Sequence, residues 1–235
     1  MPVKTDIPKK PRTNKRKKTV SSVLHLLLSF DQSIKDSYNH LNQLTIIGVD
    51  EVGIGCLAGP VVAAATILPV VPPKSKLAKD LFRLNDSKKL NHDTRKELAG
   101  LIQQHAHYSI ASASVEEIDE LNILQAGLLA MKRSVADLMT KLLPRPQNII
   151  VVVDGNKKIP NFDHEQICII QGDSQSASIA AASVIAKVFR DEWMSQLSSE
   201  YPHYLWHSNK GYGSAAHRQA ISEHGLSIWH RRSFI

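Results

Sequence analysis

The sequence predicts an α/β protein with a mixed sheet, helices on its faces and a helical C-terminal portion. Short Val- and Ile-rich runs bounded by turn residues are typical of strands buried on both faces. Two such runs, at residues 45–51 and 61–68, are joined so closely that they should form an antiparallel pair. A long helical pattern leads directly into another run at residues 149–154, as expected of an α/β unit with a crossover helix.

Each element in this order has a local signal. The predicted order is helix, strand, strand, helix, helix, strand, strand and helix, over residues 21–43, 45–51, 61–68, 91–105, 115–143, 149–154, 167–173 and 177–198. The first helix carries its apolar side chains on one face. Asn91 or Asp93 is a candidate N-cap for the second helix, and Pro144 ends the third. The last helix is rich in Ala and Ser, so it can approach the sheet closely.

Composition limits the classes of protein to which the chain can belong. With 235 residues, 43% apolar and 22% charged, it suits one globular domain over residues 44–235, preceded by the helix over 21–43. Cys56 and Cys168 lie far apart, which argues against a thiolate metal site or a disulfide framework. We find no apolar run of membrane-spanning length and no secretory signal. We therefore expect a cytoplasmic, monomeric protein with no membrane partner.

The excess positive charge lies entirely in an N-terminal tail. Residues 1–20 hold eight of the 29 basic residues and one of the 22 acidic ones, so the net charge of +7 belongs to them and the rest is neutral. A Pro- and Lys-rich segment with few apolar residues is predicted to be disordered. The tail either adds salt-sensitive affinity for phosphate backbones or is a solvated extension with no partner.

Three apolar runs stop on an acid, at Asp50 and Glu51, at Asp154 and at Asp173. Carboxylates gathered at the edge of a buried sheet repel one another, and a divalent cation is the usual agent that offsets the repulsion. A single Asp at such a position often only caps a turn. Three runs of the same form, one ending in an Asp-Glu pair, favour a metal site.

The glycine-rich loop at residues 53–59 resembles a relaxed dinucleotide-binding fingerprint. Pro60 and a β-branched strand follow it where that motif needs a helix, and the neighbouring acids would repel phosphate. Dinucleotide binding is therefore disfavoured.

The C-terminal segment, residues 201–235, interleaves aromatic and basic residues, a composition suited to a nucleic-acid strand. It holds five of the 11 histidines without regular ligand spacing, so most should be surface or capping groups. Tyr212 lies between glycines, which would allow close approach of a ligand.

Several ordered blocks closely resemble the bacterial ribonuclease HII family, the type 2 ribonucleases H. These blocks are residues 50–53, 57–62, 85–90, 118–125, 153–156, 172–173, 181–188, 190–191 and 210–213. The resemblance extends from about Leu44 to Phe234 and leaves the basic tail outside. It implies a ribonuclease H-like fold, with a mixed five-stranded sheet flanked by helices and a helical C-terminal portion.

The resemblance also implies an activity and a site. The family cuts the RNA strand of RNA–DNA hybrids and incises at ribonucleotides embedded in duplex DNA, leaving 3′-hydroxyl and 5′-phosphate ends. By motif, its four catalytic carboxylates fall on Asp50, Glu51, Asp154 and Asp173, and the first three are expected to bind metal. Hard carboxylate ligands suit two Mg²⁺ or Mn²⁺ ions in an in-line displacement.

In the family, a Gly-Arg-Gly loop and a tyrosine read the ribose 2′-hydroxyl through backbone contacts and ring packing. The matching residues are Gly53, Ile54, Gly55 and Tyr212. Ile54 stands where the family has arginine, so a phosphate contact should be missing and the preference for a lone ribonucleotide weakened. Cys56 also stands where proline is common.

Other interpretations are a resolvase- or transposase-like nuclease of the same fold acting on DNA, or a non-catalytic nucleic-acid-binding protein. The Asn85–Leu90 and Lys210–Gly213 blocks argue against the first, and the complete set of four carboxylates argues against the second. Asp191 is a further acid within a family motif, for which pairing with Lys187 and a metal role remain open.

Overall fold

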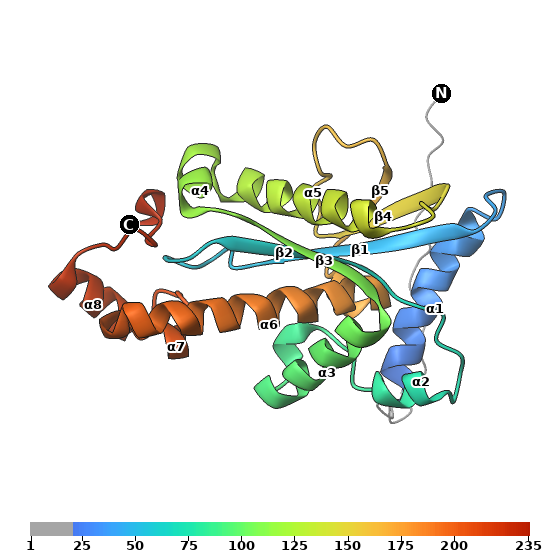
Figure 1. The fold of residues 1–235 in the computed structure, drawn as a ribbon, viewed down its shortest axis with the longest axis horizontal. Helices are drawn as coiled ribbons and strands as arrows, with labels where there is room; N and C mark the ends of the chain where they lie inside the picture. The colour runs from blue at the N-terminus through green and yellow to red at the C-terminus, as the bar shows by residue number, and fades with distance from the viewer. Residues whose placement is uncertain (1–20) are drawn as a thin grey trace.

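The computed structural model describes residues 21–235 as a five-stranded mixed sheet between two layers of helices (Figure 1). The predicted tail at residues 1–20 lies outside the described residues. The strands are β1 (Leu44–Val52), β2 (Val61–Ile67), β3 (His107–Ala113), β4 (Asn148–Asp154) and β5 (Glu165–Ile169). The helices are α1 (Ser21–Ser37), α2 (Lys76–Asp80), α3 (His92–His105), α4 (Val115–Leu121), α5 (Ile123–Lys141), α6 (Ala177–Glu200), α7 (Trp206–Asn209) and α8 (Ala215–His224).

The sheet has the order β3-β2-β1-β4-β5. The pairs β1–β2 and β2–β3 are antiparallel, whereas β1–β4 and β4–β5 are parallel. The structure confirms the mixed sheet and the antiparallel pair that close spacing predicted. Because β1 and β4 are parallel with Val49 opposite Val153, the acids that follow these two residues lie at the same edge.

Side chains along the central strands point alternately to the two faces of the sheet, and a hydrophobic core forms on each face. Val61 and Ala63 of β2 pack with α5, while Val62 and Ala64 pack with α3 and α6 on the opposite face. The long helices α5 and α6 lie on opposite sides of the sheet in Figure 1. A side chain at Gly48 would come within 2.2 Å of the α6 backbone, so glycine there permits the close contact that the small residues of α6 predicted.

Helix α1 supports the N-terminal end of α6. It ends at Ser37, earlier than the predicted residue 43, and a turn then leads into β1. The Asp31 carboxylate accepts hydrogen bonds from the backbone N–H and the hydroxyl of Ser178, at 2.9 and 2.8 Å. Its other oxygen, Oδ1, is buried and has no hydrogen-bond partner among the described residues.

The long helix predicted from Val115 to Pro144 is two helices. Asn122 separates α4 from α5 because it adopts a positive φ of 70°, which asparagine tolerates better than most residues. Its side chain then accepts the Gln125 N–H and so caps α5.

Two further predictions about strands need correction. Strand β5 ends at Ile169, so Asp173 lies beyond it in a 3₁₀ turn, Gly172–Ser174. The residue pattern also missed β3, which is an edge strand paired only with β2 and carries few large apolar side chains.

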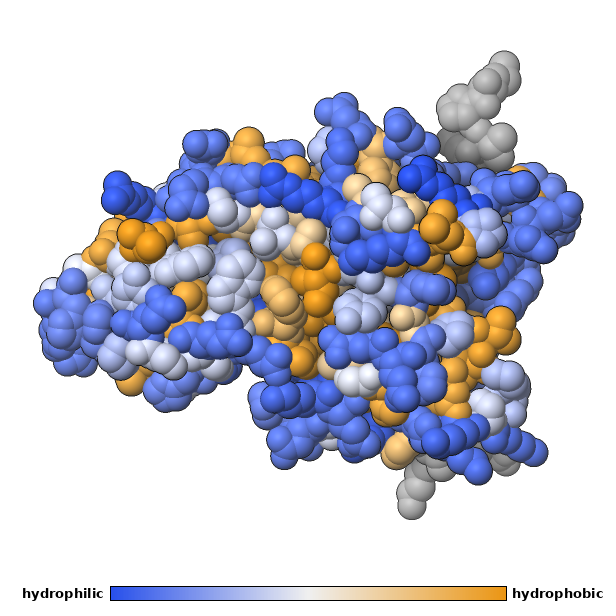
Figure 2. Space-filling view, viewed as in Figure 1, coloured by the Kyte–Doolittle hydropathy of each residue, from blue (hydrophilic) through white to orange (hydrophobic). Residues whose placement is uncertain are grey.

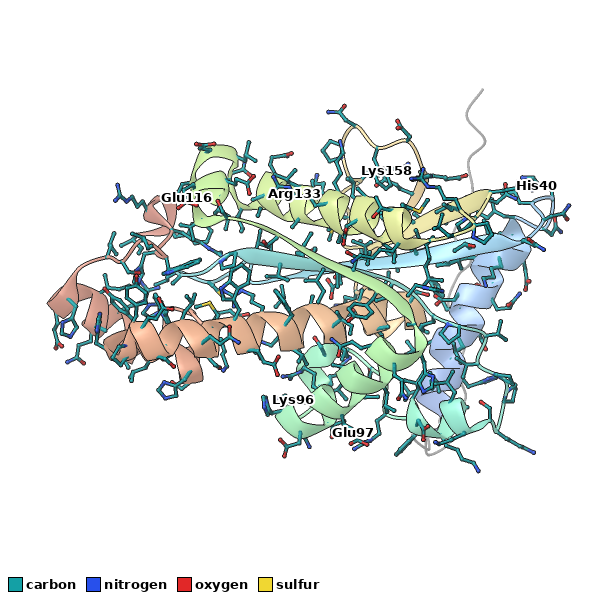
Figure 3. All side chains as sticks on the ribbon, in the orientation of Figure 1. His40, Lys96, Glu97, Glu116, Arg133 and Lys158 are labelled. Carbon is teal, nitrogen blue, oxygen red and sulfur yellow. The ribbon has the colours of Figure 1, made fainter. Side chains whose placement is uncertain are left out.

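The face of the molecule shown in Figure 2 is mainly polar. On the face shown in Figure 2, apolar residues form small groups among hydrophilic ones. The exposed side chains of His40, Lys96, Glu116 and Lys158 lie along its margin (Figure 3). Within residues 21–235, no helix combines the length and the apolar character needed to cross a bilayer.

Candidate active site

The four predicted carboxylates meet at one edge of the sheet. Asp50 and Glu51 lie near the end of β1, and Asp154 is the last residue of the parallel strand β4. Asp173 enters from the turn before α6, where the neighbouring Gly172 N–H donates to Asp154 Oδ1 at 2.6 Å. Although β5 does not end on an acid, the turn after it still brings Asp173 to the cluster.

Asp50 and Asp173 are the most buried of these acids, each with 6% of its surface exposed. Asp50 Oδ1 accepts the Glu51 backbone N–H at 2.8 Å, and the Ser183 side chain of α6 lies close enough to the carboxyl group to lower its pKa. Ser183 Oγ in turn lies 2.8 Å from the Ser87 hydroxyl. The small side chains of α6 therefore do more than allow close packing, because one of them lies beside a site carboxylate.

Burial and mutual repulsion raise the pKa values of three acids. Burial, followed by the charges of Glu51 and Asp154, raises the pKa of Asp50 well above its usual value. Burial and Asp154 raise the pKa of Glu51 to about 7. Burial and Asp86 raise the pKa of Asp173 to about 6. Near neutral pH, these four acids therefore carry negative charge that no residue of the cluster itself can neutralise.

This cluster fits hard divalent cations. Its donors are all carboxylate oxygens, which suit Mg²⁺ or Mn²⁺ better than softer metals. Lys88 offsets only part of their mutual repulsion, so a bound cation is favoured. Across residues 21–235, no three His, Cys, Asp or Glu side chains are already arranged around one point as ligands. Metal binding would therefore require the carboxylates to rotate towards a common ion.

A lysine and an aspartate beside the cluster were not assigned a role from the sequence, although they lie in the motif block at residues 85–90. Burial lowers the pKa of Lys88, but the charges of Asp50, Asp173 and Asp86 outweigh it and raise that pKa. Asp86 lies beside Asp173, and its negative charge raises the pKa of Asp173. This proximity favours protonated Asp173 in the absence of metal.

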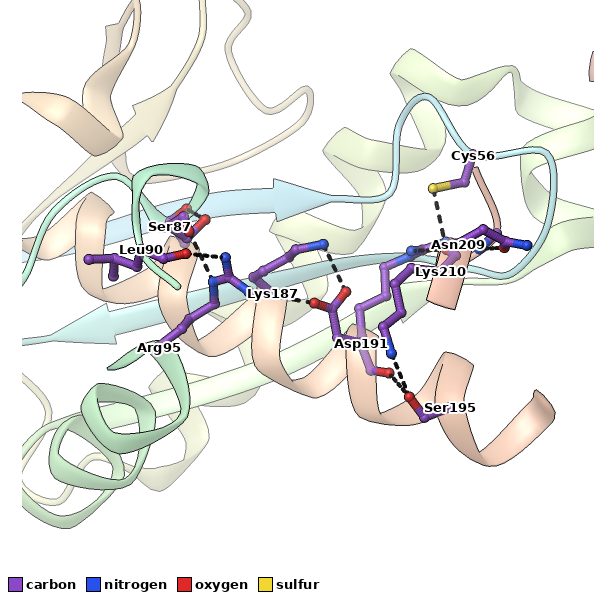
Figure 4. A network of polar contacts seen from close by, with 12 residues as sticks. Cys56, Ser87, Leu90, Arg95, Lys187, Asp191, Ser195, Asn209 and Lys210 are labelled. Atoms are coloured by element: carbon purple, nitrogen blue, oxygen red, sulfur yellow. Dashed lines mark hydrogen bonds and ion pairs between the residues drawn. The ribbon is translucent and has the colours of Figure 1, made fainter. Parts of the chain in front are cut away.

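A polar network connects this block to the C-terminal part of the chain (Figure 4). Arg95 donates to the carbonyl oxygens of Ser87 and Leu90, at 2.9 and 2.7 Å. Asp191 is 2.8 Å from Lys187 Nζ and 3.7 Å from Arg95 Nη1. The structure therefore shows the pairing of Asp191 with Lys187, and Asp191 also faces a second cation.

The predicted ribose-reading residues are brought together beside the acids. Cys56 and Tyr212 form a β-bridge, and Leu57 N–H donates to Gly211 O at 2.8 Å. Ile54 and Tyr212 are both exposed, at 37% and 44%. Gly55 faces the Tyr212 ring, since a Cβ there would lie 3.9 Å from its Cε1.

Ile54 also borders a pocket of about 110 Å³ between the acids and α5. Glu51 and Asp154 line one side, and Leu124 and Met131 line the other. Gly127 of α5 leaves room for Ile54, because a Cβ there would lie 3.3 Å from Ile54 Cδ1. The isoleucine side chain thus turns towards an apolar wall near the carboxylates.

The expectation that the C-terminal aromatics face a nucleic acid is mostly wrong. Tyr204 and Trp206 are buried with His217 and His230 in a core cluster, and among the tyrosines and tryptophans of residues 201–235 only Tyr212 is exposed. His217 Nε2 lies 3.0 Å from Trp206 Nε1 and 3.1 Å from His230 Nε2. Burial lowers the pKa of His230 to about 4, so this pair is neutral and structural.

Comparison with known proteins gives the same assignment. A family model described as Ribonuclease HII matches residues 47–235. The Ribonuclease HII of Desulfotalea psychrophila is 46% identical over 202 residues, covering 86% of this chain and 85% of the relative. That of Fusobacterium nucleatum is 44% identical over 196 residues, covering 83% and 87%.

Solved structures share the fold. In the PCNA:RNase HII complex from Archaeoglobus fulgidus, a chain 25% identical superposes with a TM-score of 0.63, covering 81% of this chain and 95% of that one. Bst-RNase HIII in complex with Mn²⁺ gives a TM-score of 0.65 at 24% identity, covering 83% and 68%. The family model and the two Ribonuclease HII sequences show that the chain belongs to the ribonuclease HII family.

Proposed function

We propose that the protein hydrolyses the RNA strand of RNA–DNA hybrids and incises duplex DNA at embedded ribonucleotides, leaving 3′-hydroxyl and 5′-phosphate ends. The observation that carries this proposal is the buried acidic cluster, Asp50, Glu51, Asp154 and Asp173, in a ribonuclease HII family member. These acids come from β1, β4 and the turn before α6, so the sheet and α6 fix their relative positions.

In this proposal, Asp50, Glu51 and Asp154 hold two Mg²⁺ or Mn²⁺ ions, and Asp173 completes the catalytic set. When bound, such ions activate the attacking water and stabilise the leaving oxygen of a phosphodiester. Ser183 lies beside the Asp50 carboxylate and favours its charged form. Lys88 offers a cation beside the same carboxylates, where the scissile phosphate brings further negative charge.

The loop at residues 53–55 and the exposed Tyr212 would select for a ribose in the substrate. Ile54, Gly55 and Tyr212 are exposed together beside Glu51, after the buried Gly53, where they can contact the sugar next to the scissile bond. Reading a ribose requires a contact to its 2′-hydroxyl, because only that group distinguishes it from deoxyribose. A main-chain N–H can make this contact whatever side chain stands at position 54.

A panel of three substrates tests the function directly. We expect cleavage of an RNA–DNA hybrid and of a DNA duplex with one ribonucleotide, each with Mg²⁺ and with Mn²⁺, and no cleavage of the all-DNA duplex. Product ends are identified by whether a polymerase extends the 3′ end and a ligase joins the 5′ end. Efficient cutting of all-DNA substrates, including branched ones, would instead indicate a resolvase- or transposase-like nuclease. Tight hybrid binding without any cleavage would indicate a non-catalytic binding protein.

A further inference from the structure

The loop at residues 53–60 rests on two buried guanidinium groups. Arg190 of α6 and Arg231 near the C-terminal end both have 0% of their surface exposed. Neither forms an ion pair with a carboxylate of residues 21–235. Burying an unpaired cation is costly unless hydrogen bonds compensate it. Here main-chain carbonyl oxygens accept bonds from every guanidinium nitrogen except Arg231 Nη2, which has no partner among residues 21–235.

The two arginines hold different parts of the loop. Arg190 donates to the carbonyl oxygens of Ala58, Pro60 and Lys210, at 2.9 to 3.0 Å. Arg231 donates to the carbonyl oxygens of Gly59 and Ile54, at 2.9 and 3.1 Å. Of the two, Arg231 alone reaches the exposed turn.

Arg231 is itself fixed from two sides. Its backbone N–H donates to Leu57 O at 2.9 Å, and its guanidinium carbon lies 5.3 Å from the centre of the Phe234 ring. The residues that follow Arg231 are also anchored, because Asp119 of α4 accepts the N–H groups of Arg232 and Ser233 at 3.0 Å. The guanidinium therefore has a defined position under the turn.

This position sets the direction of one peptide group. In a planar trans peptide, the C=O and the following N–H point in opposite directions. Since Arg231 draws the Ile54 carbonyl inward, the Gly55 N–H points outward. Among residues 21–235, no protein atom accepts a hydrogen bond from this N–H, and Gly55 is exposed beside the Tyr212 ring.

We propose that Arg231 is a positioning residue for ribose recognition: by holding the Ile54 carbonyl, it aims the Gly55 N–H at the ribose 2′-hydroxyl next to Tyr212. This inference rests on the proposed function and deepens it. Because the side chain of Ile54 offers no hydrogen bond, the direction of this peptide group carries more of the discrimination between ribose and deoxyribose. Arg231 acts through the main chain and does not touch the substrate.

The proposal is tested by binding, in an Asp154→Asn background that leaves the substrate uncut. The measured quantity is the affinity for a DNA duplex with one ribonucleotide divided by the affinity for the same all-DNA duplex. Arg231→Met should lower this ratio by about 3- to 10-fold, the value of one hydrogen bond, and leave all-DNA affinity within about twofold. A Leu98→Ala control, which opens a cavity in α3 away from the loop, should keep the wild-type ratio.

A folded Arg231→Met protein with an unchanged ratio would overturn the proposal. Should that variant not fold, Arg231→Lys retains the cation but cannot hold both carbonyl oxygens, so its ratio should fall below that of the wild type. The wild-type protein provides an independent measurement through amide hydrogen exchange. The Gly55 amide should exchange freely without ligand and become protected by the ribonucleotide duplex more than by the all-DNA duplex, and equal protection would also overturn the proposal.

Different results would contradict the proposed function and the proposed role of Arg231. A wild-type protein that cuts neither ribonucleotide-containing substrate contradicts the proposed function. A wild-type protein that cuts both, with a binding ratio insensitive to Arg231, contradicts only this inference.

Discussion

Asp154 influences three other acids, since its charge raises the pKa values of Asp50, Glu51 and Asp173. An Asp154→Asn substitution removes this charge but keeps the side-chain volume and an oxygen that can accept the Gly172 N–H. We expect cleavage to fall by about 10³-fold or more, with thermal stability and hybrid affinity close to wild type. Cleavage rates at saturating metal, with melting and binding assays alongside, check this. Near-wild-type activity would contradict the role of Asp154.

The raised pKa values predict how stability depends on pH and metal. The folded pKa values of Glu51 and Asp173, about 7 and about 6, exceed their unfolded values. Their stabilising contribution is therefore complete below the unfolded values, near pH 4, and is lost as the pH rises through 6 to 7. A bound divalent cation relieves this loss, so Mg²⁺ should raise the melting temperature more at about pH 8 than at about pH 5.

Calorimetry with and without Mg²⁺ measures this difference, and Asp50→Asn is the matched control. Removing one buried charge should stabilise the metal-free protein at about pH 8 and reduce the gain from Mg²⁺. An equal Mg²⁺ effect at both pH values would contradict the assignment of these acids as ligands.

Ile54 predicts a modest preference for a lone ribonucleotide. Ile54→Arg would place a guanidinium at an exposed position beside the acids, where a phosphate can be bound. We expect incision at an embedded ribonucleotide to rise by about 10- to 100-fold relative to hybrid cleavage, the value of one charge-assisted hydrogen bond. Ile54→Gln, which has a similar length but no charge, should give little gain. No gain from arginine, with strong wild-type incision, would show that position 54 does not limit recognition.

At the scale of elements, α1 and α6 are connected by one buried carboxylate. Burial raises the pKa of Asp31, against the lowering effect of Ser176 and Ser178, and Asp31 accepts both donors of Ser178. Asp31→Ala leaves these two donors without their acceptor, so we expect a loss of about 1–3 kcal/mol in the free energy of unfolding. Urea unfolding measures it. Asp36→Ala on the same helix removes only an exposed contact to Gln32 and should change stability by less than about 0.5 kcal/mol.

Strands with strong apolar runs could be predicted from the sequence, whereas elements defined by tertiary contacts could not. The runs at β1, β2 and β4 are buried on both faces, so the pattern alone identifies them. Strand β3 escapes this pattern because it is paired on one side only, with intermediate burial along most of its length. The break between α4 and α5 at Asn122 was also missed. The helical spacing of apolar residues continues across this position, although the φ angle of Asn122 is positive.

Part of the site could also be predicted from the sequence. The four acids and the loop beside them were found because apolar runs and motif blocks mark them. The burial of Arg190 and Arg231 could not be predicted, because nothing in the local sequence shows that carbonyl oxygens of a distant loop surround their guanidinium groups. The buried His217–His230 pair was missed for the same reason.

At the scale of the whole molecule, charge is divided unevenly. The net charge of +7 belongs to residues 1–20, outside the described part of the chain, and the rest is neutral. If the tail binds phosphates, its deletion should weaken hybrid binding and make log K fall less steeply with log salt, by about 0.9 for each phosphate that the tail neutralises. Binding measured over a range of salt concentrations checks this. An unchanged slope would mean that the tail is a solvated extension.

Helix α6 joins the two ends of the proposed reaction centre. Ser183 lies beside Asp50 at the cutting end, and Arg190, seven residues later, holds the loop at the sugar-reading end. Seven residues are almost two helical turns, so both side chains lie on one face about 10 Å apart along the axis. The helix thereby fixes the distance between the position where the ribose is recognised and the phosphodiester bond that is cleaved. This distance would be set by helix α6 and not by the bases. The position of cleavage relative to the ribonucleotide should therefore be the same in every sequence context.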